Sequence, residues 1–285
     1  MDTHSVLSQA KALQVSSGQL TSLLETVSAD QYTLVLIWPQ LGDFDTLEYA
    51  WWIERDRTQL QAANIEVRAI AIGDIPAGQK FCTYTDFPSE HLYVDPAASL
   101  HQELELYPGL GATLPGLKPQ QNGYLNLLLM CAGIGSPGTL KEVFRGYKGD
   151  KAAPQLIADD EVVKAAPLPA LKGEVFKAAG GKGFQRPFEL ATLRLRNMAE
   201  VLSNWNTYVP DAAYLTQRGA TFLFAPGSAT TKSATTTNRK LVYEWRDRNI
   251  LGFAENMSHP LSFLENYVPT YTHHNSKIVS TNLAQ

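Results

Sequence analysis

Two cysteines, Cys82 and Cys131, are the residues of this sequence that could carry thiol chemistry. A thiolate can attack a peroxide, and a second thiol can then resolve the oxidised sulfur by forming a disulfide. Lys80 lies close to Cys82 in the sequence and would favour its thiolate; the alternative is a half-buried, small apolar side chain on a short helix. Cys131 follows the apolar run 127–130, which favours a place in the core. A disulfide between the two would require their Cα atoms to lie within about 7 Å.

A second candidate site is the acidic turn Gly-Asp-Phe-Asp-Thr at residues 42–46. The turn separates an apolar segment typical of a buried strand from a segment with helical spacing, which places Asp43 and Asp45 near a helix N-terminus. Free backbone amides and the helix dipole stabilise a negative charge there by about 0.3–1 kcal/mol. Asp45 and Glu48 also fit a capping box. A carboxylate cannot attack a peroxide, so we expect this turn to be redox-inactive.

A glycine-rich turn is the third candidate. Gly133, Gly135 and Gly138 have the spacing of a dinucleotide-binding fingerprint. Pro137 lies inside the motif, however, and no acidic residue ends a second strand at the required distance. We interpret the segment as a turn followed by a helix, with an anion bound at the helix N-terminus near Thr139 as the alternative.

The remaining histidines and serines lack the surroundings of a site. His273 and His274 are adjacent in a polar tail without a nearby cysteine or carboxylate cluster, so a solvated tail is favoured over metal binding. Three serines have no nucleophile-elbow motif around them: Ser136, Ser203 and Ser258. The sequence therefore predicts no metal site, no cofactor and no hydrolase chemistry.

Arginines form two further groups. Arg186, Arg194 and Arg196 alternate with apolar residues on an expected helix, where they could line a pocket or form a solvated face. Residues 246–248, Arg-Asp-Arg, follow an expected strand and could form a local ion pair, which contributes little at a surface.

Aromatic residues suggest an interaction surface. Trp51 and Trp52 are adjacent on an expected helix, so they point about 100° apart. One of them is expected in the core, and the other, with Tyr49 or Trp38, would form an exposed aromatic patch of the kind found at interfaces. The alternative is a helix packed on both sides, which would bury both tryptophans.

The hydrophobic pattern predicts elements that position these residues. The expected strands are residues 32–38, 65–72, 91–96, 219–225 and 240–245. The expected helices are residues 4–30, 46–63, 76–82, 97–106, 139–147, 187–208 and 261–267. The order begins with helix and strand-helix-strand, which is typical of α/β proteins. It predicts a thioredoxin-like central mixed sheet flanked by helices and enlarged by insertions.

The same pattern predicts the organisation of the chain. A helical extension would span residues 1–30, and the thioredoxin-like domain residues 31–268, with a helical and loop insertion at about 107–186. A polar tail would follow at 269–285. The low-complexity segment 226–237 is expected to be a hairpin loop.

Composition narrows the function classes. A net charge of −4 disfavours a nucleic-acid partner. No apolar run is long enough to span a bilayer and no secretory leader is evident. Two cysteines in 285 residues do not form a disulfide framework, which fits a reducing, cytoplasmic compartment. Only 18% of residues are charged, a low fraction that favours a protein with partners.

Three stretches, residues 81–107, 138–155 and 218–264, resemble the peroxiredoxin-like AhpC/TSA family, and more narrowly its branch in cyanobacteria and chloroplasts. The resemblance extends over most of the chain from about residue 30. It implies a thioredoxin-like fold and a redox site at the junction between the first long strand and the following helix.

The sequence departs from the family at that junction. Redox members of the family carry Gly-Cys-Pro-x-Cys at this junction. In this sequence Gly42 matches the motif's glycine, Asp43 stands at the position of the first cysteine, and Thr46 stands at the position of the second. The resemblance therefore implies a non-catalytic binding or assembly protein. Its partner would be a protein, in this branch a photosynthetic membrane or antenna complex, with the chain peripheral on the thylakoid face. The alternative is a thiol-dependent antioxidant that uses Cys82 with Cys131. The oligomeric state stays open.

Overall fold

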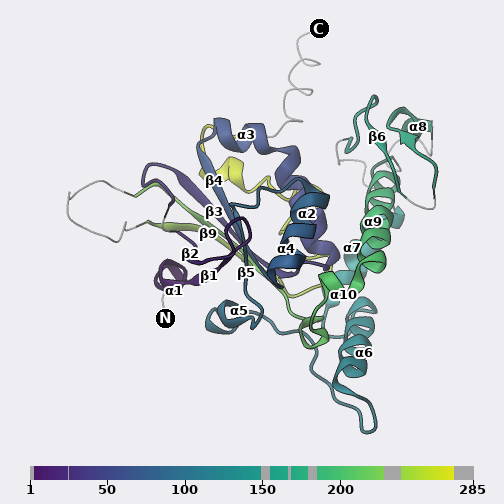
Figure 1. Ribbon diagram of the computed structural model, residues 1–285. Coiled ribbons are helices and arrows are strands. Elements are labelled where there is room, and N and C mark those ends of the chain that lie inside the picture. Colours follow the sequence, from purple (N-terminus) through teal and green to yellow (C-terminus); the bar gives the residue numbers. More distant parts are fainter. Residues whose placement is uncertain are drawn as a thin grey trace.

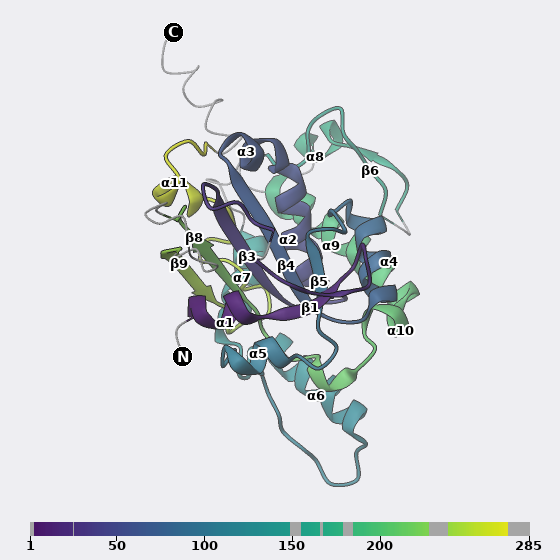
Figure 2. The same cartoon turned by 60° about the vertical axis from the view of Figure 1, so that its left-hand side comes forward.

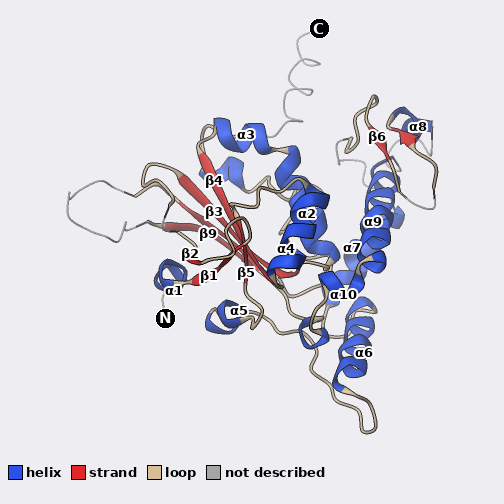
Figure 3. Cartoon of the chain, in the orientation of Figure 1, coloured by secondary structure: helices blue, strands red, loops and turns tan. Residues whose placement is uncertain are grey.

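The computed structural model describes residues 3–24, 26–148, 155–165, 168–178, 185–227 and 239–272. Its centre is a seven-stranded mixed sheet with the strand order β2-β1-β5-β4-β3-β8-β9. Helices α2 and α4 lie on one side of this sheet and α1 and α5 on the other (Figures 1 and 3). The chain is an α/β protein with a thioredoxin-like central sheet and extensions, as the order of elements predicted.

The strands of the large sheet are β1 (Lys11–Gln14), β2 (Leu20–Ser22), β3 (Tyr32–Gln40), β4 (Ile65–Ile72), β5 (Leu92–Val94), β8 (Ala220–Phe224) and β9 (Leu241–Arg246). A separate two-stranded sheet consists of β6 (Val162–Val163) and β7 (Leu171–Lys172). The helices before β6 are α1 (Thr3–Gln9), α2 (Phe44–Arg55), α3 (Arg57–Ala62), α4 (Ile75–Thr85), α5 (Ser99–Glu103), α6 (Pro119–Cys131) and α7 (Pro137–Lys148). Those after β7 are α8 (Glu174–Ala178), α9 (Gln185–Ser203), α10 (Trp205–Tyr208), the 3₁₀ turn η1 (Ala212–Tyr214) and α11 (Leu264–Tyr267).

Strand β3 is the longest strand of the sheet. It pairs in parallel with β4, with Tyr32 opposite Ile65, and antiparallel with β8, with Ile37 opposite Ala220. Both of its faces are covered, which explains why its sequence is continuously apolar rather than alternating.

Alternate residues of β3 divide the interior into two cores. Leu34, Leu36 and Trp38 face the larger core, which α2, α3 and α4 share with the sheet. Val35 and Ile37 face the smaller core, beneath α1 and α5. The division follows from the two-residue period of a strand.

The N-terminal segment corrects one prediction. The helix expected over residues 4–30 is only α1, and the chain then forms the antiparallel pair β1 and β2. Gly18, with a φ of +68°, permits the turn between them. Strand β1 pairs with β5, and the Val15 amide donates to the Leu92 carbonyl at 2.9 Å. Sheet pairing at the edge of β5 therefore outweighs the helical spacing of the leucines.

The helix expected over residues 46–63 is interrupted at Asp56. Its φ of −98° and ψ of 11° end α2, and α3 begins at the next residue. The Asp56 carboxylate accepts a hydrogen bond from the Tyr271 hydroxyl at 2.7 Å. This contact ties the last described residues to the junction of α2 and α3.

The connection between β5 and β8 is more helical than predicted. The apolar segment 125–131 belongs to α6, which already begins at Pro119, and the helix expected over 187–208 is divided into α9 and α10. Figure 2 shows α6, with the loop that precedes it, extending below the central sheet. Contacts join α2 to α9 and α7 to α9, so these insertion helices form an outer layer over α2.

Most of the predicted loop 226–237 and most of the predicted tail lie outside the described residues. Within the described part of the chain, no helix has both the length and the apolar character needed to cross a bilayer.

Candidate functional site

The acidic turn lies where β3 ends and α2 begins, and Asp43 is its N-cap. The Asp43 backbone is extended, with a φ of −70° and a ψ of 136°, and its Oδ1 accepts from the Asp45 amide at 2.9 Å. The capping box predicted for Asp45 and Glu48 is wrong, because Glu48 faces outward from the sheet and accepts from Arg194 Nε at 2.8 Å. The helix N-terminus is thus capped by a carboxylate, two residues earlier than predicted.

The other residues of the turn explain its shape. A side chain at Gly42 would meet the Tyr208 Cβ of α10 at 2.8 Å, so glycine permits this close packing. Thr46 is fully buried, and its hydroxyl donates to the Gln40 carbonyl at 3.1 Å. The turn is therefore a packed structure rather than an open loop.

Arg218, which sequence reasoning missed, lies directly beneath the turn. It precedes β8 and is fully buried, with Nη2 donating to Asp43 Oδ2 and Nη1 to Asp45 Oδ2, the latter at 3.3 Å. Burial by itself lowers the pKa of Arg218, but the facing carboxylates raise it above its ordinary value, so the guanidinium stays charged. A charged residue directly before an apolar strand was the available signal.

Two further buried groups complete the site. Asp45 is 1% exposed and accepts from the Leu251 amide at 2.8 Å, while Asp247 is 3% exposed. Burial and then the Asp43 carboxylate raise the pKa of Asp45, and burial raises the pKa of Asp247 to about 8. We call Asp43, Asp45, Asp247 and Arg218 the Arg218 cluster. Because it holds three carboxyl groups against one guanidinium, part of it is protonated at neutral pH.

The position of Asp247 corrects the local ion pair predicted for residues 246–248. Arg246 instead pairs with Glu244 on β9, and Asp247 is turned inward beneath β8. The Asp247 amide donates to the Gly219 carbonyl at 2.9 Å, which holds it beside Arg218.

The two cysteines lie in different environments, and both are free thiols. Cys82 is half-buried on α4, where burial and then the charge of Glu90 raise the pKa of its thiol to about 12. Lys80, expected to favour the thiolate, is paired with Glu200 at 3.3 Å. The thiol of Cys82 is therefore protonated at neutral pH.

Cys131 is not in the core, contrary to the prediction. It is exposed at the last residue of α6, close enough to Asp43 and Arg218 for their charges to act on it. Burial of part of the side chain, followed by the Asp43 charge, raises the pKa of the thiol. The solvent-facing thiol and the acidic turn therefore share one region of the molecule, although no disulfide or ion pair joins them.

The predicted aromatic patch is largely buried. Trp38, Tyr49 and Trp52 are each at most 2% exposed, and only Trp51 is partly accessible. Neither alternative is met in full: Trp52 lies in the core and Trp51 is partly accessible, but Tyr49 and Trp38 are buried and form no exposed patch, because α2 lies between the sheet and α9. Tyr49, for example, stacks on Phe253 with ring centroids 4.6 Å apart.

The glycine turn leads into α7, as interpreted from the sequence, and its polar groups are bonded by the chain itself, which argues against the alternative of an anion site. The Gly138 amide donates to Asn249 Oδ1 at 2.9 Å, and the Thr139 hydroxyl donates to the Ile250 carbonyl at 2.8 Å. Ser136 Oγ accepts from the Ile250 amide at 2.8 Å. Gly135, with a φ of +70°, permits the turn, which serves to dock residues 249–250.

The remaining charged candidates are also placed. Arg194 bridges Glu48 and Glu142, and Arg196 lines a groove beside α2, whereas the side chain of Arg186 lies outside the described residues. In the described ranges, no three histidine, cysteine, aspartate or glutamate residues are grouped as metal ligands would be. The pair His273 and His274 also lies outside those ranges.

Comparison with known proteins supplies the family. The model of a family described as AhpC/TSA antioxidant enzyme matches residues 52–249, and no curated protein matches the chain significantly. The match begins after Asp43 and Thr46, so it includes both cysteines and Arg218 but not the acidic turn. It spans more than half of the sequence, from within α2 to just after β9, and includes strands β4, β5, β8 and β9 of the central sheet. The chain therefore belongs to the AhpC/TSA antioxidant enzyme family.

Proposed function

We propose that this chain is a member of its family that has lost thiol chemistry at the N-terminus of α2 and acts by binding a protein partner. The observation that carries the proposal is the buried contact of Arg218 with Asp43. A nucleophilic thiol at this position would need the free amides of the turn and a nearby cation to become a thiolate. Asp43 already uses the amide, and its carboxylate and that of Asp45 already neutralise the guanidinium.

The remaining thiols are poorly suited to replace the missing one. Reactivity with peroxide requires the thiolate, and the pKa values of Cys82 and Cys131 are both raised. With a pKa of about 12, Cys82 would be a thiolate in about one molecule in 10⁵ at pH 7. This argues against the alternative of an antioxidant that uses Cys82 with Cys131.

The outer helices support a binding role. On α6, Asn122 and Asn126 point inward and hold the loop before the helix, with Asn126 Nδ2 donating to the Ala112 carbonyl at 3.0 Å. Tyr124 and Leu128 point outward, and Leu128 is 66% exposed. This is the reverse of the pattern of a surface helix, which buries its apolar side.

The same reversal occurs on α7, where Thr139 and Glu142 are buried while Leu140 and Phe144 are exposed. Helix α9 buries an ordinary apolar side, Leu190, Leu193 and Val201, but it also exposes Phe188, Met198 and Leu202. We call the exposed apolar side chains of α6, α7 and α9 the helical face. Exposed apolar side chains in such numbers are typical of protein interaction sites.

The resemblance to the cyanobacterial and chloroplast branch supports a photosynthetic membrane or antenna complex as the first partner to test. The experiment is co-sedimentation of the purified chain with thylakoid membranes and with detergent-solubilised antenna complexes. We expect Leu128→Glu to weaken binding at least tenfold. The matched control is Leu20→Glu on β2, because Leu20 is 64% exposed and lies outside the helical face.

The same preparation tests the catalytic alternative. Hydrogen peroxide consumption is followed with thioredoxin or glutathione as reductant, for the wild type, Cys82→Ser and Cys131→Ser. We expect no turnover above the rate without protein. Turnover that either serine variant abolishes would overturn the proposal and establish the thiol-dependent antioxidant instead. Equal binding of wild type and Leu128→Glu would remove the helical face from the proposal.

A further inference from the structure

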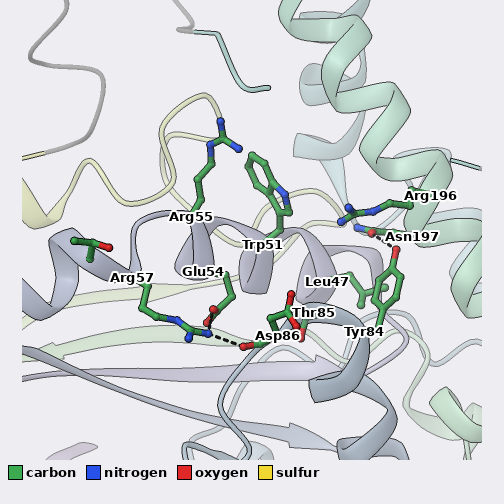
Figure 4. Close-up of a pocket in the computed structure, with 11 residues that line it drawn as sticks. Leu47, Trp51, Glu54, Arg55, Arg57, Tyr84, Thr85, Asp86, Arg196 and Asn197 are labelled. Carbon is green, nitrogen blue, oxygen red and sulfur yellow. Dashed lines mark hydrogen bonds and ion pairs between the residues drawn. The ribbon is translucent and has the colours of Figure 1, made fainter. Parts of the chain in front are cut away.

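A groove of about 480 Å³ runs between α2, α4 and α9, away from the N-terminus of α2 (Figure 4). Its lining combines aromatic rings, guanidinium groups and small polar side chains. The residues used below are Trp51, Thr58, Tyr84, Arg55, Arg57 and Arg196. The volume falls within the range of about 300–1,000 Å³ that is usual for small-molecule sites.

The groove is lined by three guanidinium groups and by the carboxylates of Glu54 and Asp86. Arg55 Nη1 pairs with Glu161 at 3.1 Å, and Arg57 pairs with Glu54. Arg196 has no carboxylate within 4.0 Å among the residues that the structure describes, and its Nε is buried without a hydrogen-bond partner there. One guanidinium of the three is therefore available to an anion.

Arg196 is held in place by its neighbours. Its guanidinium carbon lies 5.6 Å from the centroid of the Tyr84 ring. The Tyr84 hydroxyl donates to Asn197 Oδ1 at 3.0 Å, and Asn197 is 3% exposed. A buried amide thus fixes the ring, and the ring supports the guanidinium, so the cation is positioned before any ligand arrives.

Aromatic walls flank this cation. Figure 4 shows the Trp51 indole and the Tyr84 ring projecting into the groove from α2 and α4, with Leu47 between them. Both rings are partly exposed. The far side of Trp51 is covered by Arg55, whose guanidinium carbon lies 4.8 Å from the indole centroid. A flat molecule lying in the groove would contact the aromatic surface of Trp51 or Tyr84, and its charged group would face Arg196.

We propose that this groove binds a small planar organic anion, an aromatic ring that carries a carboxylate or a phosphate. The anion supplies a charged acceptor for the unpartnered Nε of Arg196, and the ring replaces water against Trp51 or Tyr84. The site is separate from the Arg218 cluster and does not depend on the proposed loss of thiol chemistry.

Isothermal titration calorimetry at pH 7 and low salt tests the proposal with two anions and their neutral counterparts. The carboxylate arm compares indole-3-carboxylate with indole, and the phosphate arm compares adenosine 5′-monophosphate with adenosine. We expect one anion to bind with a Kd below about 1 mM and its neutral counterpart to bind at least tenfold more weakly. The arm that binds identifies the anionic group.

Two matched variants, each of which replaces one arginine with glutamine, locate the site. Arg196→Gln should weaken binding of the anion at least tenfold. Arg248→Gln should not, because Arg248 lies over Tyr107, outside the groove. Thr58→Glu, at an exposed position of the lining, should also weaken binding tenfold by charge repulsion, and it serves as the test if Arg196→Gln does not fold. Absence of binding in both arms, equal binding of a neutral counterpart, or unchanged affinity in the variants would overturn the proposal.

Discussion

Replacing Arg218 with glutamine removes the only cation of the Arg218 cluster. Asp43, Asp45 and Asp247 would then face one another without a counter-charge, in a site where Asp45 and Arg218 are at most 1% exposed. Removing one partner of a buried ion pair costs about 3–5 kcal/mol, because the other partner stays buried and uncompensated. We expect Arg218→Gln to lower the free energy of unfolding by that amount, out of a total of about 5–15 kcal/mol for a domain.

Asp43→Asn removes a negative charge from the Arg218 cluster, whereas Arg218→Gln removes the positive charge. Asparagine caps a helix as well as aspartate does, and Arg218 Nη1 would keep its contact with Asp45 at 3.3 Å. The variant loses a charged hydrogen bond of about 1.5–3 kcal/mol, but it also removes the repulsion between Asp43 and Asp45. We therefore expect a smaller loss, about 1–2 kcal/mol. Lys177→Gln, which removes an exposed pair with Asp159, is the control and should leave stability unchanged.

Urea unfolding at pH 7, followed by circular dichroism and by tryptophan fluorescence, measures the difference between the two variants. If the two signals give the same transition, unfolding is two-state, and free energies of unfolding can be calculated from the curves. The reasoning would be refuted by a loss for Asp43→Asn as large as that for Arg218→Gln. It would also be refuted by a loss below about 1 kcal/mol for Arg218→Gln, since the cluster would then not depend on its cation.

Three further predictions use the same assay. The pKa of Asp247 in the folded protein is about 8, above its ordinary value, so its contribution to stability falls as pH rises to about 8. The free energy of unfolding of Asp247→Asn should therefore rise relative to that of the wild type between pH 5.5 and pH 8, and a difference that stays constant with pH would contradict this. The folded pKa of His101 is about 4, below its ordinary value, because the ring is buried. Stability should therefore fall between pH 6.5 and pH 4 by up to about 1.4 kcal/mol per pH unit, and the fall should be smaller in His101→Gln. Gly219→Ala places a Cβ 2.0 Å from the Ile37 carbonyl oxygen and should cost more than about 2 kcal/mol, unlike Gly111→Ala in open space.

The sequence predicted the central strands well because their signal is local. The apolar runs that became β3 and β4 are long, rich in β-branched residues and bounded by turn residues, so burial on both faces could be read directly. The helical spacing near the N-terminus was equally clear but misleading. Strand β1 forms because Val15 and its neighbours pair with residues near Leu92, and such distant pairing leaves no mark on the local pattern.

The candidate site shows the same limit. Asp43 could be identified from its turn, but its partner Arg218 lies 175 residues further along the chain. Leu128 was assigned to an apolar segment beside a core cysteine, whereas Asn122 and Asn126 take the buried side of α6 because they bond the preceding loop. Prediction from sequence assumes that the apolar side of a helix faces the core, and α6 departs from that assumption.

Residues 249–252 form a second link between α2 and α7, beside the one that Arg194 makes through Glu48 and Glu142. The Leu251 amide donates a hydrogen bond to Asp45 at the start of α2, and Asn249 and Ile250 form hydrogen bonds with residues at the start of α7. Shifting α7 relative to α2 would break these four hydrogen bonds together. The segment therefore fixes the position of α7 relative to the central sheet. A partner that binds to α7 would meet an ordered surface, and little conformational entropy would be lost on binding.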